Sequence, residues 1–462
     1  MPAQPWFKLC VCRKRDQHDE KKPITQNENA MTIIYWFRRD RRLSDNPAFM
    51  RALGKANKTG DTLLPVTLLA DNPVNEWGFA RFGNHRLTFE AQSLNGLAKR
   101  LRALGSDLYQ PTQTGVAGLV TLAKALGANT ICCEAIDAPE EISQVQQLTD
   151  AGLDVQSLEQ SALLAHDELP FEPSKTPTVF SEFRRLVEKA KCQPRTPTVA
   201  PTTLAPLPAA ATDCVKPYEI AHRAPPMDAR SAFPYQSEEW HGDEASGQSY
   251  IERYFSSRLP QHYKETRNGL AGTDYSTKLS PWLAVGSISA AQVWQALQQH
   301  EHEQGANDST YWIWFELLWR DHFRLMMRRF GRKLFARSGL SRQPLPPISH
   351  NVQGFKRWCA GNTGHAFIDA AMRELSATGY LSNRMRQNAA SYLIHDLGGD
   401  WRAGAAWFEH CLVDFDVNSN QGNWAYIAGV GTDPRGGRRF NPDKQAHDYD
   451  RDGSYRDLWR EL

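Results

Sequence analysis

The sequence predicts a doubly wound parallel α/β domain, a long linker and an all-helical domain, in that order. Three observations support this fold class. The chain has 462 residues, which exceeds what one ordinary core holds, so two domains are expected. Short β-rich runs alternate with helical periods as far as residue 159, as in a parallel sheet with crossover helices. From about residue 244 onward the apolar period is that of a helix.

We expect the α/β domain to span residues 31–160. The predicted strands are 32–37, 63–69, 131–136 and 153–159, and the predicted helices are 47–53, 87–104 and 140–151. Pro47 suits the first turn of a helix, because its ring fixes φ and the missing N–H has no partner there anyway. This alternation favours crossover connections and a parallel sheet.

The next segments are polar or rich in proline. Residues 1–30 carry both signs of charge without a continuous apolar run, so we interpret them as an extension that is disordered or that precedes the true start at Met31. Residues 161–243 contain twelve prolines and little periodicity, which predicts an interdomain linker on the surface. The helical domain would then span 244–462, and no tail is expected because the last residues, GSYRDLWREL, still resemble a helix.

Bulk composition excludes several classes of function. The formal net charge is only +2, with 54 basic and 52 acidic residues, so a nucleic-acid partner requires a local basic patch. No apolar run approaches the roughly 20 residues that cross a bilayer, which predicts no membrane partner. The eight cysteines lack metal-type spacing, so no metal site is expected. We expect a cytoplasmic monomer, with an organelle as the alternative location.

The turn after the first strand, WFRRDRRLSDNPAF, is rich in charge. Arg39 and Asp40 are interpreted as a structural ion pair, because most such pairs serve architecture. No Gly-x-Gly-x-x-Gly follows this strand, which disfavours a nicotinamide site. A dark flavoenzyme that receives hydride from a nicotinamide is therefore disfavoured too.

A polar cluster between residues 262 and 289 reads HYKETRNGLAGTDYSTKLSPWLAVGSIS. It combines a glycine with four hydroxyl side chains just before a predicted helix. Hydroxyls and unpaired backbone N–H groups can bind phosphate at a helix N-terminus. An ordinary capped helix explains the same residues equally well.

The apolar helical segment FELLWRDHF carries two charges four residues apart, Glu316 and Arg320. They could form an intrahelical pair. A carboxylate among tryptophans is nevertheless costly to bury without a partner or a ligand, which favours a functional role for Glu316. Eight basic residues lie between Arg320 and Arg342, and this stripe is either a polyanion-binding surface or a solvated helix face.

The stretch from residue 380 to residue 424 holds the most chemistry. It groups a guanidinium, carboxylates and amides that could together bind one polar aromatic ring. Those side chains are Asn383, Arg386, Asp414, Asp416 and Asn420. Trp401 and Trp424 lie in the same stretch, and indole is oxidisable enough to give an electron to an excited cofactor. The residues therefore favour a flavin site with redox photochemistry.

Six motifs in order resemble the photolyase and cryptochrome family. They are WFRRDRRLSDNPAF, GTDYSTKLSPWLAVGSIS, FELLWRDHF, GNTGHAFIDAAMREL, SNRMRQN and DFDVNSNQGNW. The branch that they resemble most is that of the DASH cryptochromes, because of the extended GTDYSTKLS motif, Tyr380 in place of a tryptophan, and Gln387 after SNRMR. The ending GRRFNPDKQAHDYDRDGSYRDLWREL also resembles that branch.

The resemblance implies an antenna domain followed by a helical domain that holds FAD bent into a U. Its FAD-binding positions correspond here to Tyr263, Ser276, Thr277, Lys278, Leu279, Ser280, Glu316, Arg320, Asn383, Arg386, Asp414, Asp416 and Asn420. Arg386 and Asp414 would pair across the isoalloxazine. Asn420 would face flavin N5, where a neutral amide suits either protonation state.

The same resemblance implies light-driven repair of cyclobutane pyrimidine dimers by electron transfer from reduced flavin. Glu316, Asn383 and Asn420 would be catalytic, and the substrate pocket would contain Trp319, Tyr380, Gln387 and Tyr426. Flipping a dimer out costs least in single strands. Tyrosines where duplex-active relatives carry indoles offer less stacking surface, which predicts single-stranded DNA as the preferred partner.

The chain departs from the family in its electron supply. Trp424 and Trp401 match the proximal and middle members of the family's tryptophan chain, but the distal position holds Ile348. Photoreduction would then be slow, end at Trp401, or use another aromatic residue.

Two further expectations follow from the resemblance. A folate antenna, 5,10-methenyltetrahydrofolate, would bind near Glu140 and Glu141, although the same carboxylates suit the first turn of a helix. The alternative function is a blue-light photoreceptor that binds DNA or a partner with little repair, and the expected lack of a tail disfavours it.

Overall fold

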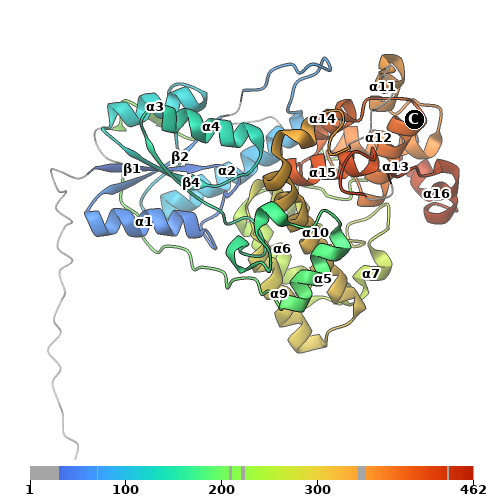
Figure 1. Ribbon diagram of the computed structural model, residues 1–462, viewed down its shortest axis with the longest axis horizontal. Helices are drawn as coiled ribbons and strands as arrows, with labels where there is room; N and C mark the ends of the chain where they lie inside the picture. The colour runs from blue at the N-terminus through green and yellow to red at the C-terminus, as the bar shows by residue number, and fades with distance from the viewer. Residues whose placement is uncertain are drawn as a thin grey trace, which may run out of the picture.

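The computed structural model describes residues 31–69, 71–207, 211–219, 224–341, 350–433 and 436–460. The predictions for residues 1–30 and for Ile348 lie outside these ranges. In Figure 1 the sheet with its helices occupies one side of the molecule, and a larger group of helices, coloured yellow to red, occupies the other. The predicted order of an α/β part followed by a helical part is confirmed.

The sheet has six strands in the order β5-β4-β1-β2-β3-β6. Their bounds are β1 Thr32–Phe37, β2 Thr62–Thr67, β3 Tyr109–Pro111, β4 Thr130–Glu134, β5 Asp154–Leu158 and β6 Val215–Pro217. The first five strands run parallel, and β6 pairs antiparallel with β3 at the edge. Every residue of β1 is buried, because this central strand is covered by helices on both faces. The predicted doubly wound sheet is confirmed.

Four helices flank the sheet, and Figure 1 shows α1 on one face with α3 and α4 on the other. They are α1 Pro47–Thr59, α2 Asn84–Ala103, α3 Gly115–Ala125 and α4 Pro139–Asp150. Three of them agree with predicted helices, whereas β3 and α3 were not predicted. A strand of three residues is too short to show the alternation on which strand prediction depends.

The turn after β1 is held by Asp40 in a way that the sequence did not predict. Asp40 Oδ2 accepts a hydrogen bond from Tyr35 Oη at 2.5 Å and one from Gln160 Nε2 at 3.0 Å. Arg39 instead pairs with Glu90 of α2 at 2.9 Å. The predicted Arg39–Asp40 pair is therefore wrong, because the buried carboxylate is satisfied by neutral donors.

The segment 161–243 contains more structure than a linker. It includes α5 Phe180–Ala190, the edge strand β6 and the short 3₁₀ helices His166–Glu168, Pro173–Lys175 and Glu238–Trp240. In Figure 1 α5, in green, lies beside α10. The buried face of α5 consists of Phe180, Phe183 and Val187. This segment therefore adds a helix to the second domain and a strand to the first.

The helical domain begins at α6 and has α10 at its centre. Its helices are α6 Glu244–Ser256, α7 Tyr263–Thr266, α8 Ser280–Val285, α9 Ala290–Gln304, α10 Asp308–Phe330, α11 Val352–Cys359, α12 Ala366–Thr378, α13 Asn383–His395, α14 Trp401–Cys411, α15 Val417–Ile427, α16 Pro442–Tyr449 and α17 Ser454–Leu458, with 3₁₀ helices Leu259–His262 and Gly331–Phe335. Asn307 begins α10 with a capping box, which fixes the start of this 23-residue helix. No described helix is long and apolar enough to cross a membrane.

Buried carboxylates join the two domains. Glu244 of α6 accepts hydrogen bonds from the backbone N–H groups of Leu43 and Ser44, each at 2.9 Å. Asp321 of α10 likewise accepts from the N–H groups of Leu163 and Leu164, each at 2.9 Å. The Glu244 bonds hold α6 against the turn after β1, and the Asp321 bonds hold α10 against the segment that follows β5. Helix α10 supplies one wall of the site described next.

Candidate cofactor and substrate site

A cavity of about 590 Å³ lies in the helical domain. This central cavity lies between α8, α10, α13 and α15. Its lining includes Tyr263, Thr277, Leu279, Ser280, Glu316, Trp319, Arg320, Asn383, Arg386, Gln387, Asp414, Asp416 and Tyr426. Most of the residues predicted from separate motifs are thus brought together. The volume is in the range of pockets that bury an organic cofactor.

Asp414 and Arg386 form the predicted ion pair in the wall of this cavity. Arg386 Nη2 lies 2.8 Å from Asp414 Oδ2, and Ser280 Oγ donates to the same oxygen at 2.7 Å. Asp414 Oδ1 is buried and has no hydrogen-bond partner. A buried carboxylate oxygen without a donor is costly, so this atom fits a ligand that supplies an N–H or O–H group.

A smaller chamber of about 90 Å³, the inner chamber, shares Asn383, Arg386 and Asp414 with the central cavity and adds Asn420 and Trp424. The Nδ2 of Asn420 donates to the carbonyl oxygen of Ala405 at 3.1 Å, which leaves its Oδ1 for a ligand. The predicted amide and the proximal tryptophan therefore border the same space. A polar planar ring fits this end of the site, because acceptors, a guanidinium and an indole surround it.

Asp416 both caps a helix and carries charge into the cavity. Its Oδ1 accepts from the Ser419 N–H as the N-cap of α15, and its Oδ2 lies 3.0 Å from Arg324 Nη2. Burial raises the pKa of this carboxyl, but Arg324 and Arg320 outweigh burial and lower it to about 2. Asp416 is therefore ionised at neutral pH.

Glu316 reaches the central cavity from α10 and pairs with Arg267, not with Arg320. The interpretation as an intrahelical pair is wrong, because Arg320 Nη1 donates instead to the Ser161 carbonyl oxygen at 2.6 Å. Burial raises the pKa of Glu316, although Arg267 opposes the shift. Arg267 in turn lies over the Trp312 ring, 4.3 Å from its centroid.

Two aromatic side chains of the cavity are held in place by neighbours. Trp319 stacks on Phe180 of α5 with ring centroids 3.7 Å apart and planes 10° from parallel. Tyr426 lies edge-on to Trp319 at 6.1 Å, and Arg438 Nη2 donates to its hydroxyl at 2.8 Å. Flat surfaces held in this way can stack on a base.

Three predicted residues, Ser276, Lys278 and Tyr380, line neither the central cavity nor the smaller chamber. Tyr380 is buried and stacks on Phe233 at 5.5 Å, so the structure does not place it in the substrate pocket. Lys278 has a left-handed backbone, with φ of 53°, and its Nζ lies 3.3 Å from the Tyr275 ring centroid. This backbone turns the lysine side chain into the core and away from the cavity.

The basic stripe on α10 is largely engaged by protein groups. Arg324 binds Asp416, Arg320 binds the Ser161 carbonyl, and Arg329 donates to the Thr176 carbonyl. These partners belong to the linker segment and to the start of α15. The three arginines of the stripe are therefore used in contacts within the protein. Arg332 and Lys333, just beyond α10, are exposed.

Several lining residues were not predicted. They are Arg267, Trp312, Phe315, Phe323, Arg384, Asn423, Arg438 and Phe440. Arg267 belongs to the polar cluster between residues 262 and 289, and Arg384 belongs to the motif SNRMRQN. Nothing in the sequence alone shows that Arg267 meets Glu316, because 49 residues separate them.

A wider cavity of about 770 Å³, the boundary cavity, lies at the boundary of the two domains. Glu140 and Glu141 line it together with Trp77, Arg332 and Phe335. Glu140 is paired with Arg81 at 2.8 Å. The two carboxylates predicted for an antenna therefore face a space that could hold an aromatic ligand.

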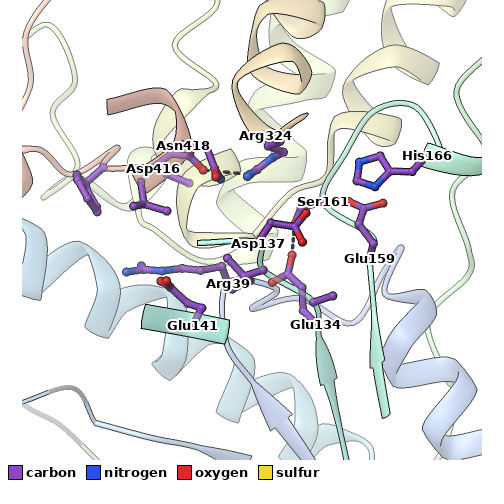
Figure 2. A pocket seen from close by; sticks show the side chains of 15 residues that line it. Arg39, Glu134, Asp137, Glu141, Glu159, Ser161, His166, Arg324, Asp416 and Asn418 are labelled. Carbon is purple, nitrogen blue, oxygen red and sulfur yellow. Dashed lines mark hydrogen bonds and ion pairs between the residues drawn. The ribbon is translucent and has the colours of Figure 1, made fainter. Parts of the chain in front are cut away.

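A third, narrow pocket lies at the ends of β4 and β5 (Figure 2). Glu134 and Ser161 meet there on the sheet side, while Arg324 and Asn418 reach in from the helical domain. Burial, followed by repulsion from Asp40, raises the pKa of Glu134 to about 7. One Glu134 oxygen has no hydrogen-bond partner. This pocket joins the domains but is too small for a cofactor, with a volume of about 40 Å³.

The two predicted tryptophans are both buried. Trp424 is edge-on to Phe408 at 5.0 Å and to Trp358 at 6.2 Å. Trp401 donates from Nε1 to the Arg337 carbonyl oxygen at 3.1 Å. Trp424 lines the inner chamber, so an indole is in place to exchange an electron with a ring bound there.

Comparison with known proteins agrees with this geometry. A family model described as DNA photolyase matches residues 33–203, and one described as the FAD binding domain of DNA photolyase matches residues 312–461. A protein from Synechocystis named cryptochrome DASH is 40% identical and covers 93% of this chain and 87% of its own. The Xenopus laevis protein of that name is 39% identical, with 93% and 82% covered.

Solved structures give the same picture. A crystal structure of a Synechocystis cryptochrome superposes with a TM-score of 0.83 at 38% identity, covering 94% of this chain and 89% of that one. A bacterial class III photolyase from Agrobacterium tumefaciens has a TM-score of 0.75 at 27% identity, covering 95% and 88%. The predicted fold is thereby confirmed over nearly the whole chain.

Proposed function

The chain belongs to the photolyase and cryptochrome family, in its DASH branch, and on that premise we propose that it repairs cyclobutane pyrimidine dimers in single-stranded DNA under blue light. The observation that carries the proposal is the position of Glu316. This half-buried carboxyl, paired with Arg267, stands in the same cavity as the Arg386–Asp414 pair expected to hold the flavin. A substrate base and the cofactor ring would thus meet across one space.

FAD is the cofactor that fits the central cavity and its inner chamber. Asp414 Oδ1 lacks a donor, Arg386 is oriented by Asp414, and Asn420 offers an amide oxygen. When bound, the flavin supplies the electron for dimer splitting, and the protein positions it and tunes its charge. Thr277, Leu279 and Ser280 would lie along the ribityl and phosphate portion, at the start of α8.

Glu316 would recognise the polar edge of a flipped pyrimidine. A carboxylate oxygen of Glu316 can accept a hydrogen bond from a base N–H group, and Arg267 fixes its orientation. Trp319 and Tyr426 would stack beside the flipped bases, and Gln387 lines the same wall. Each of these side chains has a partner of its own, so the pocket is preformed.

Single-stranded DNA would be preferred because its bases are already largely unpaired. Extraction from a duplex costs a few kcal/mol, and the pocket wall must offset this cost by stacking. Tyr426 offers less surface than the indole that duplex-active relatives carry. Tyr380 offers no stacking surface to a base in the central cavity, because its ring packs on Phe233 outside the lining of that cavity.

The experiment compares repair rates on single-stranded and duplex dimer substrates after the absorption spectrum has confirmed bound flavin. We expect repair that is faster on single strands by about tenfold or more. Glu316→Gln should lower the repair rate by at least about tenfold while flavin absorption is unchanged. Glu303→Gln, the same substitution on exposed α9, is the control. Equal rates on both substrates, or full activity of Glu316→Gln, would contradict the proposal.

The boundary cavity would hold the antenna, 5,10-methenyltetrahydrofolate. Glu141 and Glu140 can accept hydrogen bonds from the amino groups of a pterin, and Trp77 and Phe335 offer aromatic surface. Glu141→Gln should release the folate absorption band and leave the flavin band intact. Retention of the folate by this variant would place the antenna elsewhere.

A further inference from the structure

Trp77 contacts His350, a residue that lies close in sequence to the position of the family's distal tryptophan. It belongs to the loop between β2 and α2 of the α/β domain, yet it packs against the core that contains Trp401 and Trp424. Its ring is edge-on to His350 with centroids 5.2 Å apart. His350 follows Ile348, the family's distal position, by two residues.

A continuous line of ring contacts joins the flavin side to Trp77. Trp424 contacts Trp358 at 6.2 Å, and Trp358 contacts Phe355 at 6.0 Å. Phe355 contacts His350 at 5.4 Å, and His350 contacts Trp77. Trp358 is itself an indole, so an electron vacancy at Trp424 has a buried neighbour to which it can move.

The chain on either side of Trp401 also contacts the region around Trp77. The residues on either side of Trp401 both meet this region, because the Asp400 N–H donates to His350 Nδ1 at 3.1 Å and the Arg402 guanidinium lies 5.9 Å from the Trp77 ring centroid. Arg402 is also bonded to the Asp400 carboxylate at 2.6 Å, which offsets its charge beside Trp77. Trp401 therefore lies in a helix whose first turn contacts both His350 and Trp77.

We infer that Trp77 is the solvent-side electron donor that replaces the missing distal tryptophan. The inference rests on the proposed function only in requiring bound FAD that light can excite. One electron leaves the Trp77 indole and fills the vacancy on Trp401 or Trp358, which has already given an electron toward the flavin through Trp424. The oxidised indole then loses its N–H proton to water, and an external thiol returns a hydrogen atom.

The surroundings of the indole N–H favour Trp77 over Trp407 as the donor. The Nε1 of Trp407 is buried without a hydrogen-bond partner, so a proton on an oxidised Trp407 has no acceptor. Trp77 is half-buried and lines the boundary cavity, so in protein without a bound antenna solvent can take the proton and a thiol can approach. Loss of that proton makes return of the electron slower.

The test measures flavin photoreduction with a thiol donor and follows the tryptophan radical by transient absorption. In Trp77→Phe we expect photoreduction to slow by about tenfold or more and the long-lived deprotonated radical to disappear. Prolonged aerobic illumination of wild-type protein should leave oxidised tryptophan at Trp77 in peptide maps. Trp314→Phe, which removes an indole on the far part of α10, should match the wild type. Ile348→Trp introduced into Trp77→Phe should restore the rate.

The inference would be overturned if Trp77→Phe kept the wild-type rate of photoreduction and the wild-type lifetime of the tryptophan radical. If Trp407→Phe lost both instead, Trp407 would be the terminal electron donor. If Trp77→Phe folds poorly, as judged by flavin content and melting, Trp77→Tyr and the peptide map decide the matter. Chemically pre-reduced Trp77→Phe should repair dimers like the wild type, since no donor chain is then needed. If pre-reduced wild-type protein did not repair dimers, the proposed function would be refuted. The role of Trp77 would still be tested by the photoreduction measurement, which does not depend on repair.

Discussion

At the scale of single residues, the inner chamber depends on one amide. Asn420 uses its Nδ2 on the Ala405 carbonyl, so the group presented to a ligand is a neutral oxygen. A neutral acceptor adds no charge beside a flavin ring that becomes negative on reduction. The choice of Asn over Asp at this position therefore affects the reduction potential more than the shape of the chamber.

We expect Asn420→Asp to lower the reduction potential of the bound flavin. A carboxylate beside the reduced, anionic ring adds like-charge repulsion on the order of 2–4 kcal/mol, as for two charges a few ångströms apart in a partly buried site. A spectroscopic redox titration measures the shift. Asn420→Ser, which is neutral, should shift the potential much less, and an unchanged midpoint in Asn420→Asp would show that residue 420 does not face the ring.

Part of the predicted site is brought together by the structure. Asn383, Arg386 and Asp414, which come from two separate motifs, line one cavity. Lys278 and Tyr380 lie in equally specific motifs but point into the core. A left-handed φ at Lys278 and the stacking of Tyr380 on Phe233 decide those directions, and neither can be read from residue types.

At the scale of elements, α5 is a helix that the proline-rich composition of residues 161–243 did not predict. Its three buried residues form one apolar face, but prolines on both sides favoured the interpretation as a linker. The helix depends on α10 for its burial, since Phe180 stacks on Trp319 and is also edge-on to Phe315 at 5.0 Å. In that arrangement α5 supports the aromatic wall of the substrate site from behind.

Phe180→Ala should therefore weaken DNA binding without releasing FAD. Removal of a ring that is 6% exposed costs about 3 kcal/mol or more of stability and frees Trp319 to change rotamer. We expect a higher dissociation constant for dimer-containing single strands, measured by fluorescence anisotropy, with an unchanged flavin spectrum. Phe183→Ala in the same helix is the matched control, because its ring does not stack on Trp319. Equal binding by both variants would remove α5 from the site.

At the scale of the whole molecule, buried carboxyls set how stability varies with pH. Burial raises the pKa of Glu374 to about 8, and burial with Asp40 raises that of Glu134 to about 7. Both groups are more easily protonated in the folded than in the unfolded protein, so their stabilisation is complete at low pH and is lost as pH rises through these values. Burial lowers the pKa of His322 to about 4, which opposes this trend below its usual value of 6.5.

Glu374 should therefore contribute a fall in the free energy of unfolding between pH 6.5 and pH 8, which burial of Lys278 opposes by lowering the pKa of that lysine, and Glu374→Gln should remove the contribution of Glu374. A neutral amide can keep the contact with Tyr455 that the protonated carboxyl makes, while it cannot ionise. Since one pKa unit corresponds to about 1.4 kcal/mol, the slope due to Glu374 amounts to about 2 kcal/mol across this window. Urea unfolding at several pH values measures the slope, and Glu303→Gln on exposed α9 should retain it. An identical slope in Glu374→Gln would mean that Glu374 is already ionised in the folded protein, with its charge compensated by Lys278 and Arg386 across the core.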